Sequence, residues 1–510
     1  MTSASDDERY LAGLGYRQQL FREMGGFSNF AISFSIISIL TGAVLLYGYG
    51  LKFAGPIVNS VGWPVVSLFT LAVAASMAEI ASAYPTAGGL YFWAQKLGGP
   101  RWAWVTAWLN MIGQVTITAG INIAAAIYLI GAATRIFGLT GNYTNWYLQL
   151  AVMVVIMVPQ VLINIYGIRL TARLNDISVW WHIGGVAAIV LLLAVLGAHH
   201  NPASFLFSFA PAVDAYEVSR TLAVADAQTA SPLFRMIPAL ADLYRAAPVG
   251  LMFVLALLQA QWTYTGYDAS AHVAEETKMA RLNSAWGIFL SVAVSAVVGY
   301  AMLMVLTWCI PNGDVAATAA DPYPVLYIVS RNLSPILSNV IAIIIGGAMW
   351  LCGLASVTSM GRMWYAFARD DGMPGSKYLK RVSRNGTPVW AIVVTSVLAV
   401  LVCVYAAAFY VVTSISTITL YLAYVIPILL NLRRRLDPAL TPWSLGRFGP
   451  AINFVAIAWC VFIAFVFMLP PNELVLWTML VLAAGLAIAV FRRGIRTRPP
   501  SPAAAAPHTR

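Results

Sequence analysis

The chain has 510 residues, of which 60% are hydrophobic and 10% are charged, and its formal net charge is +11. Soluble domains carry about 45–50% apolar and about 25% charged residues, so this composition excludes a soluble enzyme, a disordered scaffold and a nucleic-acid-binding protein. It indicates a polytopic membrane protein, in which an excess of Lys and Arg marks the side that each loop faces.

The N-terminal tail, residues 1–26, is polar and acidic at its start, which is unlike a signal peptide. Twelve apolar segments follow, and each has about the 20 residues that a membrane-spanning helix requires. Strands of a membrane barrel would be about 10 residues long with alternating polarity, so the segments predict an all-α fold. The predicted spans are residues 28–54, 62–84, 101–136, 147–167, 177–198, 249–272, 285–309, 335–366, 388–407, 409–430, 450–470 and 473–492.

The basic residues predict the orientation of these spans. If the N-terminus is cytoplasmic and the spans alternate, 24 of the 30 Lys and Arg residues fall on the cytoplasmic side. Cytoplasmic loops characteristically carry such an excess, so both termini are expected in the cytoplasm. The long outer loop, 199–248, is expected to pack over the membrane face, and the C-terminal tail, 493–510, is expected to be disordered.

Spans 1 and 6 are each interrupted by small and polar residues near their middle. Span 1 carries Ser38, Thr41 and Gly42, and span 6 carries the stretch from Gln261 to Asp268. Their positions, five spans apart, are typical of two inverted five-helix repeats that each open with a discontinuous helix. Unwound backbone is tolerated at membrane depth where it lines a cavity, and its freed groups suit a carboxylate, an ammonium or a cation. The alternative is that the small residues only let helices pack closely.

Three polar side chains inside the spans are candidate functional residues. Asp268 is costly at membrane depth, so it is expected to pair with the amine of a substrate or to link span 6 to a neighbouring helix. Asn110 and Gln114 are four residues apart in span 3 and share a helix face. They are candidate substrate contacts, with hydrogen bonding between helices as the alternative.

Other reactive side chains have structural interpretations. Glu275 and Glu276 are expected at the cytoplasmic mouth of span 6, paired with nearby basic residues such as Lys278 or Arg281. The four cysteines all lie in apolar runs, which predicts no disulfide framework, and no Cys or His spacing indicates a metal site. No cofactor is expected.

Three separated stretches resemble the amino acid–polyamine–organocation (APC) superfamily of permeases. AEIASAYPTAGGLYFWAQKLGGP (Ala78–Pro100) is similar to the signature between spans 2 and 3, YTGYDASAHVAEETK (Tyr264–Lys278) to the span-6 pattern, and MWYAFARDDGMP (Met363–Pro374) to the stretch after span 8. FSNFAISFSIISILTGAVLLYGYGL and LNDISVWWHIGG resemble the amino acid/choline transporter branch, which includes GABA permeases. The resemblance covers nearly the whole chain.

The resemblance implies the LeuT-type fold, with 12 transmembrane helices, a 5+5 inverted repeat and discontinuous helices 1 and 6. The ten-helix transport core would occupy 27–430, with repeat one at about 27–198 and repeat two at about 249–430, separated by the outer loop. Helices 11 and 12, within 431–492, would be peripheral.

The resemblance also implies a substrate site at the two breaks. This chain has Leu-Thr-Gly where the family more often has Gly-Ser-Gly, so the hydrogen-bond pattern there is open. Trp262 stands where the family places an aromatic gate, and two of the three aromatic residues of the span-6 break are expected to offer cation–π contacts together. The substrate-binding residues, with the two span-3 amides included, are Ser38, Leu40, Thr41, Gly42, Ala43, Asn110, Gln114, Gln261, Trp262, Tyr264, Thr265, Gly266, Tyr267 and Asp268.

The implied ion-coupling residues are His182, Ser356 and Ser359. His182 stands where many proton-coupled members have a lysine, at the place where sodium-coupled relatives bind the ion between spans 1, 5 and 8. Histidine titrates near neutrality, which favours protons, and a histidine that only packs between helices is the alternative. Ser356 and Ser359 would be ligands in a sodium-coupled variant, although such hydroxyls often bond their own helix backbone.

The sequence therefore predicts a secondary active transporter and not an enzyme, because it has no nucleophile–base pair and no Walker-type loop. It is expected to import an amino acid or related amine across the plasma membrane (the inner membrane of a bacterial cell) by proton symport through alternating access. The alternatives are a choline, GABA or polyamine permease, an exchanger without ion coupling, or a nutrient sensor with a transporter fold. Expected partners are this small molecule, a proton or sodium ion and the lipid bilayer, and no nucleic acid; the oligomeric state is open.

Overall fold

The computed structural model describes residues 4–141, 143–213, 232–406, 409–470 and 472–492. Within these ranges, nine helices are long and apolar enough to cross a membrane, and a tenth candidate is a helix pair bent by 96°. The nine are α2–α3 (Gly26–Leu45), α5 with the turn before it (Val58–Ala83), α7 (Pro100–Phe137), α8 (Trp146–Tyr166), α9 (Ile168–Leu196), α16 (Ala280–Trp308), α19 (Pro335–Arg369), α22 (Phe409–Arg434) and α23 with the turn before it (Gly446–Val466). The bent pair is α12 (Pro238–Ala246) with α13–α14 (Pro248–Thr263).

These helices agree with the predicted all-helical, polytopic membrane fold. Each of the twelve predicted spans overlaps at least one helix. Two of the twelve correspond to shorter apolar helices, α21 (Val389–Ala406) and α24 (Glu473–Arg492). The count of twelve spans, the two inverted repeats and the division into core and peripheral helices therefore stay predictions.

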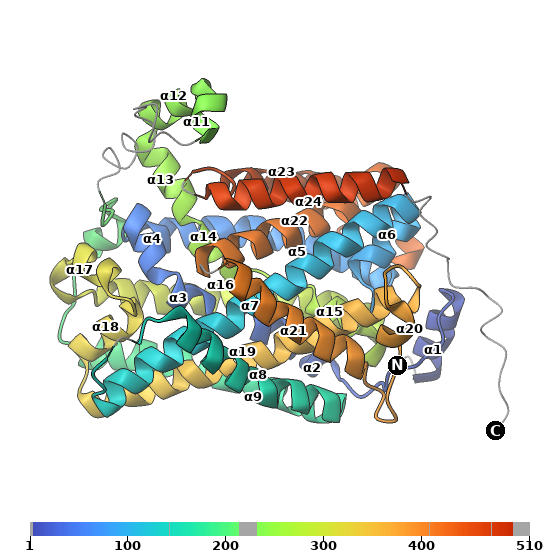
Figure 1. The fold of residues 1–510 in the computed structure, drawn as a ribbon, viewed down its shortest axis with the longest axis horizontal. Helices are drawn as coiled ribbons and strands as arrows, with labels where there is room; N and C mark the ends of the chain where they lie inside the picture. Colours follow the sequence, from blue (N-terminus) through green and yellow to red (C-terminus); the bar gives the residue numbers. More distant parts are fainter. Residues whose placement is uncertain (1–3, 142, 214–231, 407–408, 471, 493–510) are drawn as a thin grey trace.

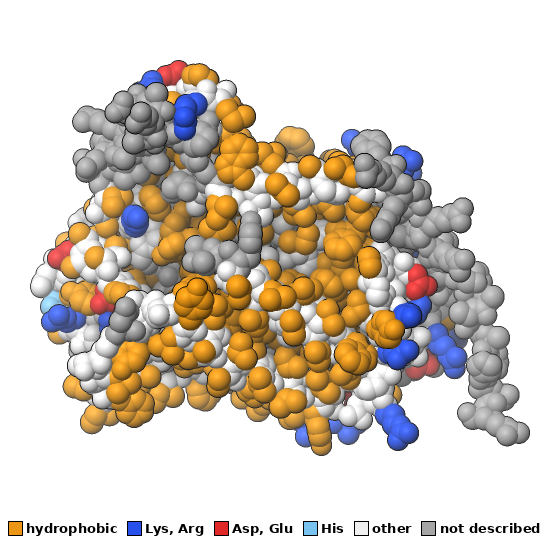
Figure 2. Space-filling model, in the orientation of Figure 1, with side chains coloured by type: hydrophobic (Ala, Val, Ile, Leu, Met, Phe, Trp, Pro, Cys, Tyr) orange, Lys and Arg blue, Asp and Glu red, His pale blue; other side chains and the backbone are white. Residues whose placement is uncertain are grey.

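The helices run along the long axis of the molecule (Figure 1). One end, which we call the N-terminal end, carries α1 (Ala4–Gly13), α6 (Leu90–Gly98) and α20 (Ser376–Leu379). The opposite end carries α17 (Val315–Ala320) and α18 (Pro324–Asn332). Hydrophobic side chains cover the broad middle of the visible face, and Lys and Arg side chains gather at the N-terminal end (Figure 2). This distribution fits a body that crosses a bilayer with its basic end on one side.

Helix α7 is the central helix of the bundle. It packs against α6, α8, α19, α21 and α22. In an 18-residue apolar stretch of α7, 89% of the residues are buried. In the corresponding stretches of α8 and α9, 33% of the residues are buried. Since α8 and α9 present most of their surface outward, they face the surrounding lipid and α7 faces protein.

The long loop after α9 packs partly onto α4 and the residues that follow it, and its predicted place over the outer membrane face stays a prediction. The Ile57 N–H donates to the Ser208 carbonyl at 3.1 Å, and the Ala212 N–H donates to the Leu51 carbonyl at 3.1 Å. Residues 214–231 of this loop, and the predicted tail 493–510, lie outside the described residues.

Both predicted helix breaks are present. The first separates α2 from α3, and Ser38 within it adopts a φ of 29°. The second separates α14 from α15, and Gly266 within it adopts a φ of 84°. The helices around the breaks are α2 (Gly26–Ile37), α3 (Gly42–Leu45), α4 (Tyr47–Phe53), α13 (Pro248–Ala256), α14 (Leu258–Thr263) and α15 (Ala269–His272).

Gly266→Ala is expected to lower the free energy of unfolding by about 1–3 kcal/mol, because it adds a side chain to left-handed backbone in a packed site. The added Cβ would lie 2.3 Å from Ile36 Cγ2. Thermal unfolding of the purified protein in detergent measures the change. The control is Gly184→Ala in the middle of α9, where a Cβ meets nothing within 4 Å and alanine favours the helix. An equal loss in the two variants would contradict the role assigned to Gly266.

Candidate functional site

The two helix breaks meet at the centre of the molecule. A Cβ on Gly42 would lie 2.8 Å from the Thr263 Cα, and one on Gly266 would lie 2.3 Å from the Ile36 Cγ2. Only glycine permits these approaches, because any larger residue would overlap its neighbour. The first break therefore packs on the end of α14, and the second packs on the end of α2.

A small, nearly closed cavity lies between the breaks, with about 10 Å³ open to the centre of a water-sized sphere. It combines hydroxyl and backbone groups from the breaks with an apolar wall from α2 and α7. Its lining residues are Ile36, Ile37, Thr41, Gly42, Ile117, Ile121, Trp262, Thr263 and Thr265. Ligand sites of small molecules commonly have this composition, an apolar wall with a few placed polar groups.

The first break leaves backbone donors unused. The N–H groups of Thr41 and Gly42 both donate to the Ser38 carbonyl, at 2.8 and 3.1 Å. The N–H groups of Ile39, Leu40 and Ala43 have no acceptor among the described residues. Buried N–H groups are nearly always paired, so this group of three can receive an anionic atom.

The second break leaves backbone acceptors unused. The Tyr264 and Tyr267 carbonyls accept from Tyr421 and Ser33, each at 2.8 Å. The carbonyls of Thr263 and Thr265, two residues that line the cavity, have no donor among the described residues. The first break thus carries unpaired donors next to the lining residues Thr41 and Gly42, and unpaired acceptors belong to two residues of the lining itself.

Four of the predicted substrate-binding residues line the cavity, namely Thr41, Gly42, Trp262 and Thr265. The remaining ten are in or next to the breaks but are not in its lining. They are Ser38, Leu40, Ala43, Asn110, Gln114, Gln261, Tyr264, Gly266, Tyr267 and Asp268.

The three aromatic residues of the second break do not form one surface. The Trp262 indole lines the cavity, donates from Nε1 to Ser416 Oγ at 3.2 Å and meets the Phe409 ring edge-on at 5.4 Å. Tyr264 hydrogen-bonds outward to Ser67, at 2.6 Å. Tyr267 packs on the Tyr424 ring instead. Of the three rings, Trp262 lines the cavity in this conformation, and a cation–π contact shared by two of them stays a prediction.

Asp268 is completely buried and is held by four side chains from three helices. Its Oδ2 accepts from Asn110 Nδ2 at 2.9 Å, from Gln114 Nε2 at 3.0 Å and from His272 Nε2 at 3.0 Å, and its Oδ1 accepts from Tyr424 Oη at 2.9 Å. Two roles were predicted for Asp268, pairing with the amine of a substrate or linking span 6 to a neighbouring helix. These four hydrogen bonds correspond to the second role. The amides of Asn110 and Gln114 take part in the same network. They therefore form hydrogen bonds between helices, which is the alternative predicted for them.

His182 lies beside the first break. Its Nδ1 is 2.7 Å from the Ser178 carbonyl, and its Nε2 is 2.8 Å from Ser38 Oγ. A carbonyl can only accept, so Nδ1 carries the proton and Nε2 of the neutral ring accepts from the Ser38 hydroxyl. Ser38 Oγ is also 2.6 Å from Thr41 Oγ1, and Thr41 lines the cavity. A chain of hydrogen bonds thus connects the histidine to the cavity.

The serines of α19 hydrogen-bond to α7 and not to His182. Ser356 shares a hydrogen bond of 2.6 Å with Thr118, and Ser359 donates to Gln114 Oε1 at 3.2 Å. Both partners are on α7. The residue of α19 that contacts the first break is Cys352, whose Sγ lies 3.4 Å from the Ile36 carbonyl. The roles of His182 in proton coupling, or of Ser356 and Ser359 in a sodium-coupled variant, therefore stay predictions.

Two buried ion pairs close the N-terminal end. Glu275 receives both terminal nitrogens of Arg369, at 2.8 and 2.9 Å, and Glu276 receives two nitrogens of Arg362, at 3.1 and 3.2 Å. The predicted pairing with Lys278 or Arg281 is wrong, because the partners come from the end of α19. For example, the Arg281 guanidinium instead donates to backbone carbonyls.

The N-terminal tail covers these ion pairs. Tyr16 donates to Asp370 at 2.6 Å, and Gln18 donates to the Glu275 carbonyl at 2.8 Å. The Met24 N–H donates to the Glu276 carbonyl at 2.9 Å. The tail, α15 and α19 are thereby joined into one closure.

Sequence reasoning missed four charged or polar partners in these networks, namely His272, Tyr424, Arg362 and Arg369. His272 follows Asp268 by four residues, so the shared helix face was the available signal. Arg362 is a fully buried charge within a span, and such a charge demands a partner. Tyr424 had no comparable signal, because its role depends on which face of α22 meets α15.

The comparisons with known proteins agree on one family. The model of the family described as amino acid permease matches residues 24–491. The amino-acid permease BAT1 homolog of Oryza sativa subsp. japonica is 33% identical over 484 residues, covering 91% of this chain and 87% of that protein. Amino-acid permease BAT1 of Arabidopsis thaliana is 32% identical, covering 90% of this chain and 88% of that protein. The thiamine transporter thi9 of Schizosaccharomyces pombe is 26% identical, with 79% and 69% covered.

Asp268→Asn is expected to lower the free energy of unfolding by about 3 kcal/mol, because the new amide would point a donor at donors and leave them unpaired. Thermal unfolding in detergent measures this loss. The control is Asp314→Asn, where the carboxylate caps α17 by accepting from the Ala317 N–H at 2.8 Å and asparagine caps equally well. If both variants unfold at the wild-type temperature, the four-donor network does not stabilise the fold.

Stability is expected to fall in acid through Glu275. Burial raises the pKa of this carboxyl, but Arg369 and the Ala87 N–H outweigh burial and hold its pKa below the ordinary value of 4.5. A carboxyl with a lowered folded-state pKa stabilises the protein above its unfolded pKa, and this contribution is lost as the pH falls through the folded pKa.

Glu275→Gln should therefore unfold at a temperature that changes less between pH 6 and acid than the wild type does. The control is Glu8→Gln, which removes an exposed carboxylate of α1 and should keep the wild-type dependence. Identical acid dependence in wild type and Glu275→Gln would refute the assignment.

Proposed function

The chain belongs to the amino acid permease family, and from this premise we propose that it binds an amino acid or related amine between the two helix breaks and moves it by alternating access. As a family member it is an integral membrane protein and a transporter of amino acids or related organic molecules. The observation that supports the finer proposal is that the two helix breaks meet around one small cavity lined by Thr41, Gly42, Trp262 and Thr265.

The polarity of the cavity supports a zwitterionic substrate. The free N–H groups of Ile39, Leu40 and Ala43 suit a carboxylate, and the free carbonyls of Thr263 and Thr265 suit an ammonium. Ile117 and Ile121 of α7 offer an apolar surface to the rest of the molecule. Choline and polyamines lack a carboxylate and would leave the donors unused, so an amino acid, GABA included, is favoured.

Two sets of contacts with different chemistry, one towards each end of the molecule, support alternating access. Towards the N-terminal end, the Glu275–Arg369 and Glu276–Arg362 pairs lie under the tail. Towards the opposite end, the Trp262 and Phe409 rings are in contact over the cavity. We propose that the N-terminal end faces the cytoplasm of a cell whose plasma membrane the protein spans, and that transport opens these closures in turn.

Proton coupling through His182 is the proposed energy source. Protonation of Nε2 would turn it from acceptor to donor, and Ser38 Oγ would then have to direct its hydrogen towards Thr41. The charge on the imidazole would thereby change the hydrogen bonding at the cavity wall. Sodium coupling has less support, because Ser356 and Ser359 bond to α7.

An exchanger without ion coupling and a nutrient sensor are the competing functions. An exchanger would move substrate only against substrate on the other side. A sensor would bind substrate without net transport. Both alternatives give a different result from a symporter in one flux measurement.

The decisive measurement is uptake by proteoliposomes that contain the purified protein. Amino acids, GABA, choline, a polyamine and thiamine are offered first with an inward proton gradient and then with an inward sodium gradient. We expect an amino acid to accumulate with the proton gradient, and His182→Ala to lose the accumulation while counterflow exchange remains. The control is His199→Ala in the loop after α9, which should transport as the wild type does.

Each other outcome rejects part of the proposal. Accumulation that follows sodium and ignores pH would reject proton coupling, and full accumulation by His182→Ala would reject His182 as the coupling residue. Counterflow without accumulation would indicate an exchanger. Saturable binding without any flux would indicate a sensor.

A further inference from the structure

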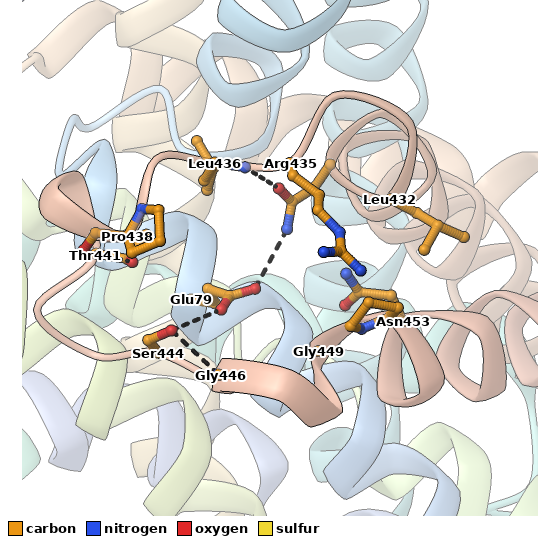
Figure 3. A pocket seen from close by; sticks show the side chains of 12 residues that line it. Glu79, Leu432, Arg435, Leu436, Pro438, Thr441, Ser444, Gly446, Gly449 and Asn453 are labelled. Atoms are coloured by element: carbon orange, nitrogen blue, oxygen red, sulfur yellow. Dashed lines mark hydrogen bonds between the residues drawn. The ribbon is translucent and has the colours of Figure 1, made fainter.

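A second pocket lies at the N-terminal end, away from the helix breaks. It is bounded by the ends of α5 and α22, the start of α23 and the loop that joins α22 to α23 (Figure 3), with a volume of about 180 Å³. None of its lining residues belongs to the cavity between the breaks. The proposed transport path therefore leaves this pocket without a role.

Glu79 fixes one wall of the pocket. Its Oε1 accepts from the Leu445 N–H at 2.9 Å and from Ser444 Oγ at 3.2 Å, and its Oε2 accepts from Asn431 Nδ2 at 3.3 Å (Figure 3). Asn431 in turn accepts from the Leu436 N–H at 3.1 Å. The carboxylate thus holds the connecting loop in place. A carboxylate offers about four acceptor sites, so one remains open towards the pocket.

Arg435 and Asn453 line the opposite wall without partners. The Arg435 guanidinium has no hydrogen bond or ion pair among the described residues, and it points towards the Asn453 amide (Figure 3). Asn453 is 4% exposed, and its buried Oδ1 has no hydrogen-bond partner among the described residues. A buried polar group of this kind calls for a ligand or an ordered water. The guanidinium fork fits the oxygens of a phosphate or carboxylate.

The surroundings of the pocket resemble the interface between membrane and water. Trp286 is 45% exposed and meets Trp443 of the connecting loop, and Phe448 of the same loop is 58% exposed. Arg433 and Arg434 at the end of α22 are also exposed. Aromatic residues gather at the level of lipid headgroups, and basic residues directly after a membrane helix attract lipid phosphates. A ligand of this pocket would therefore come from the lipid layer.

We propose that this pocket binds the headgroup of a zwitterionic phospholipid. The phosphate would accept from the Arg435 guanidinium, and the ammonium would donate to Asn453 Oδ1 and to the open acceptor site of Glu79. A headgroup with negative charge alone would meet the Glu79 carboxylate unfavourably, whereas a headgroup with both charges matches the two walls. The lipid would join α5 to α22 and α23 at the level of the headgroups.

The test compares phosphatidylethanolamine with phosphatidylglycerol of identical acyl chains. Native mass spectrometry of the purified full-length protein, released from detergent, measures the fraction that retains each lipid. We expect tighter retention of phosphatidylethanolamine and about tenfold weaker retention by Arg435→Gln, which loses the charge-assisted hydrogen bonds. Arg433→Gln is the matched control, since it removes the same charge two residues away without lining the pocket, and it should retain the lipid as the wild type does.

Inorganic phosphate separates a lipid from a free anion. If phosphate alone competes the lipid off at equal concentration, the pocket is a site for free phosphate and the proposal fails. Equal losses in Arg433→Gln and Arg435→Gln, or tighter retention of phosphatidylglycerol, would show general attraction of lipid to a basic surface and would also overturn it. Should Arg435→Gln unfold, Asn453→Leu serves as the second variant, because it removes the acceptor of the ammonium and must weaken retention.

Discussion

A backbone N–H or C=O that loses its helical partner inside an apolar bundle must find another partner, and much of this architecture depends on that constraint. The chain breaks two helices in its centre and pairs most of the released groups locally, through Ser38 in the first break and through Tyr421 and Ser33 in the second. The groups left unpaired belong to the two breaks, which meet around one cavity. The cost of breaking helices is thereby concentrated where a polar substrate can offset it.

The two closures around this cavity differ in how they respond to their environment. The Trp262–Phe409 contact depends on dispersion and excluded water, so pH and salt affect it little. The Glu275–Arg369 and Glu276–Arg362 pairs lose their attraction if a proton or water reaches them. Since a charged residue that is left without its partner in a buried site is costly, the ionic closure is expected to open as a unit with the tail that covers it.

The sequence was informative where a residue type costs free energy at its depth in the membrane. The small and polar residues around Gly42 and Gly266 predicted both breaks. The position of Asp268 inside an apolar span predicted that its carboxylate has partners. The partners themselves were beyond reach, because they depend on how helices rotate against each other. Glu275 pairs with Arg369, 94 residues away, although Arg281 lies closer along the chain. In the same way, α19 turns Ser356 and Ser359 to α7 rather than to His182.

The glycine contact between the breaks also separates two kinds of recognition. Gly42 and Thr263 touch through their backbones, so the polar groups there are set by chain geometry and a substitution at Gly42 would disturb both breaks. Ile117 and Ile121 come from the uninterrupted helix α7 and reach the same cavity through side chains alone. A permease built in this way can acquire a new substrate preference through substitutions in α7. The backbone groups that recognise the carboxylate and ammonium common to amino acids stay unchanged.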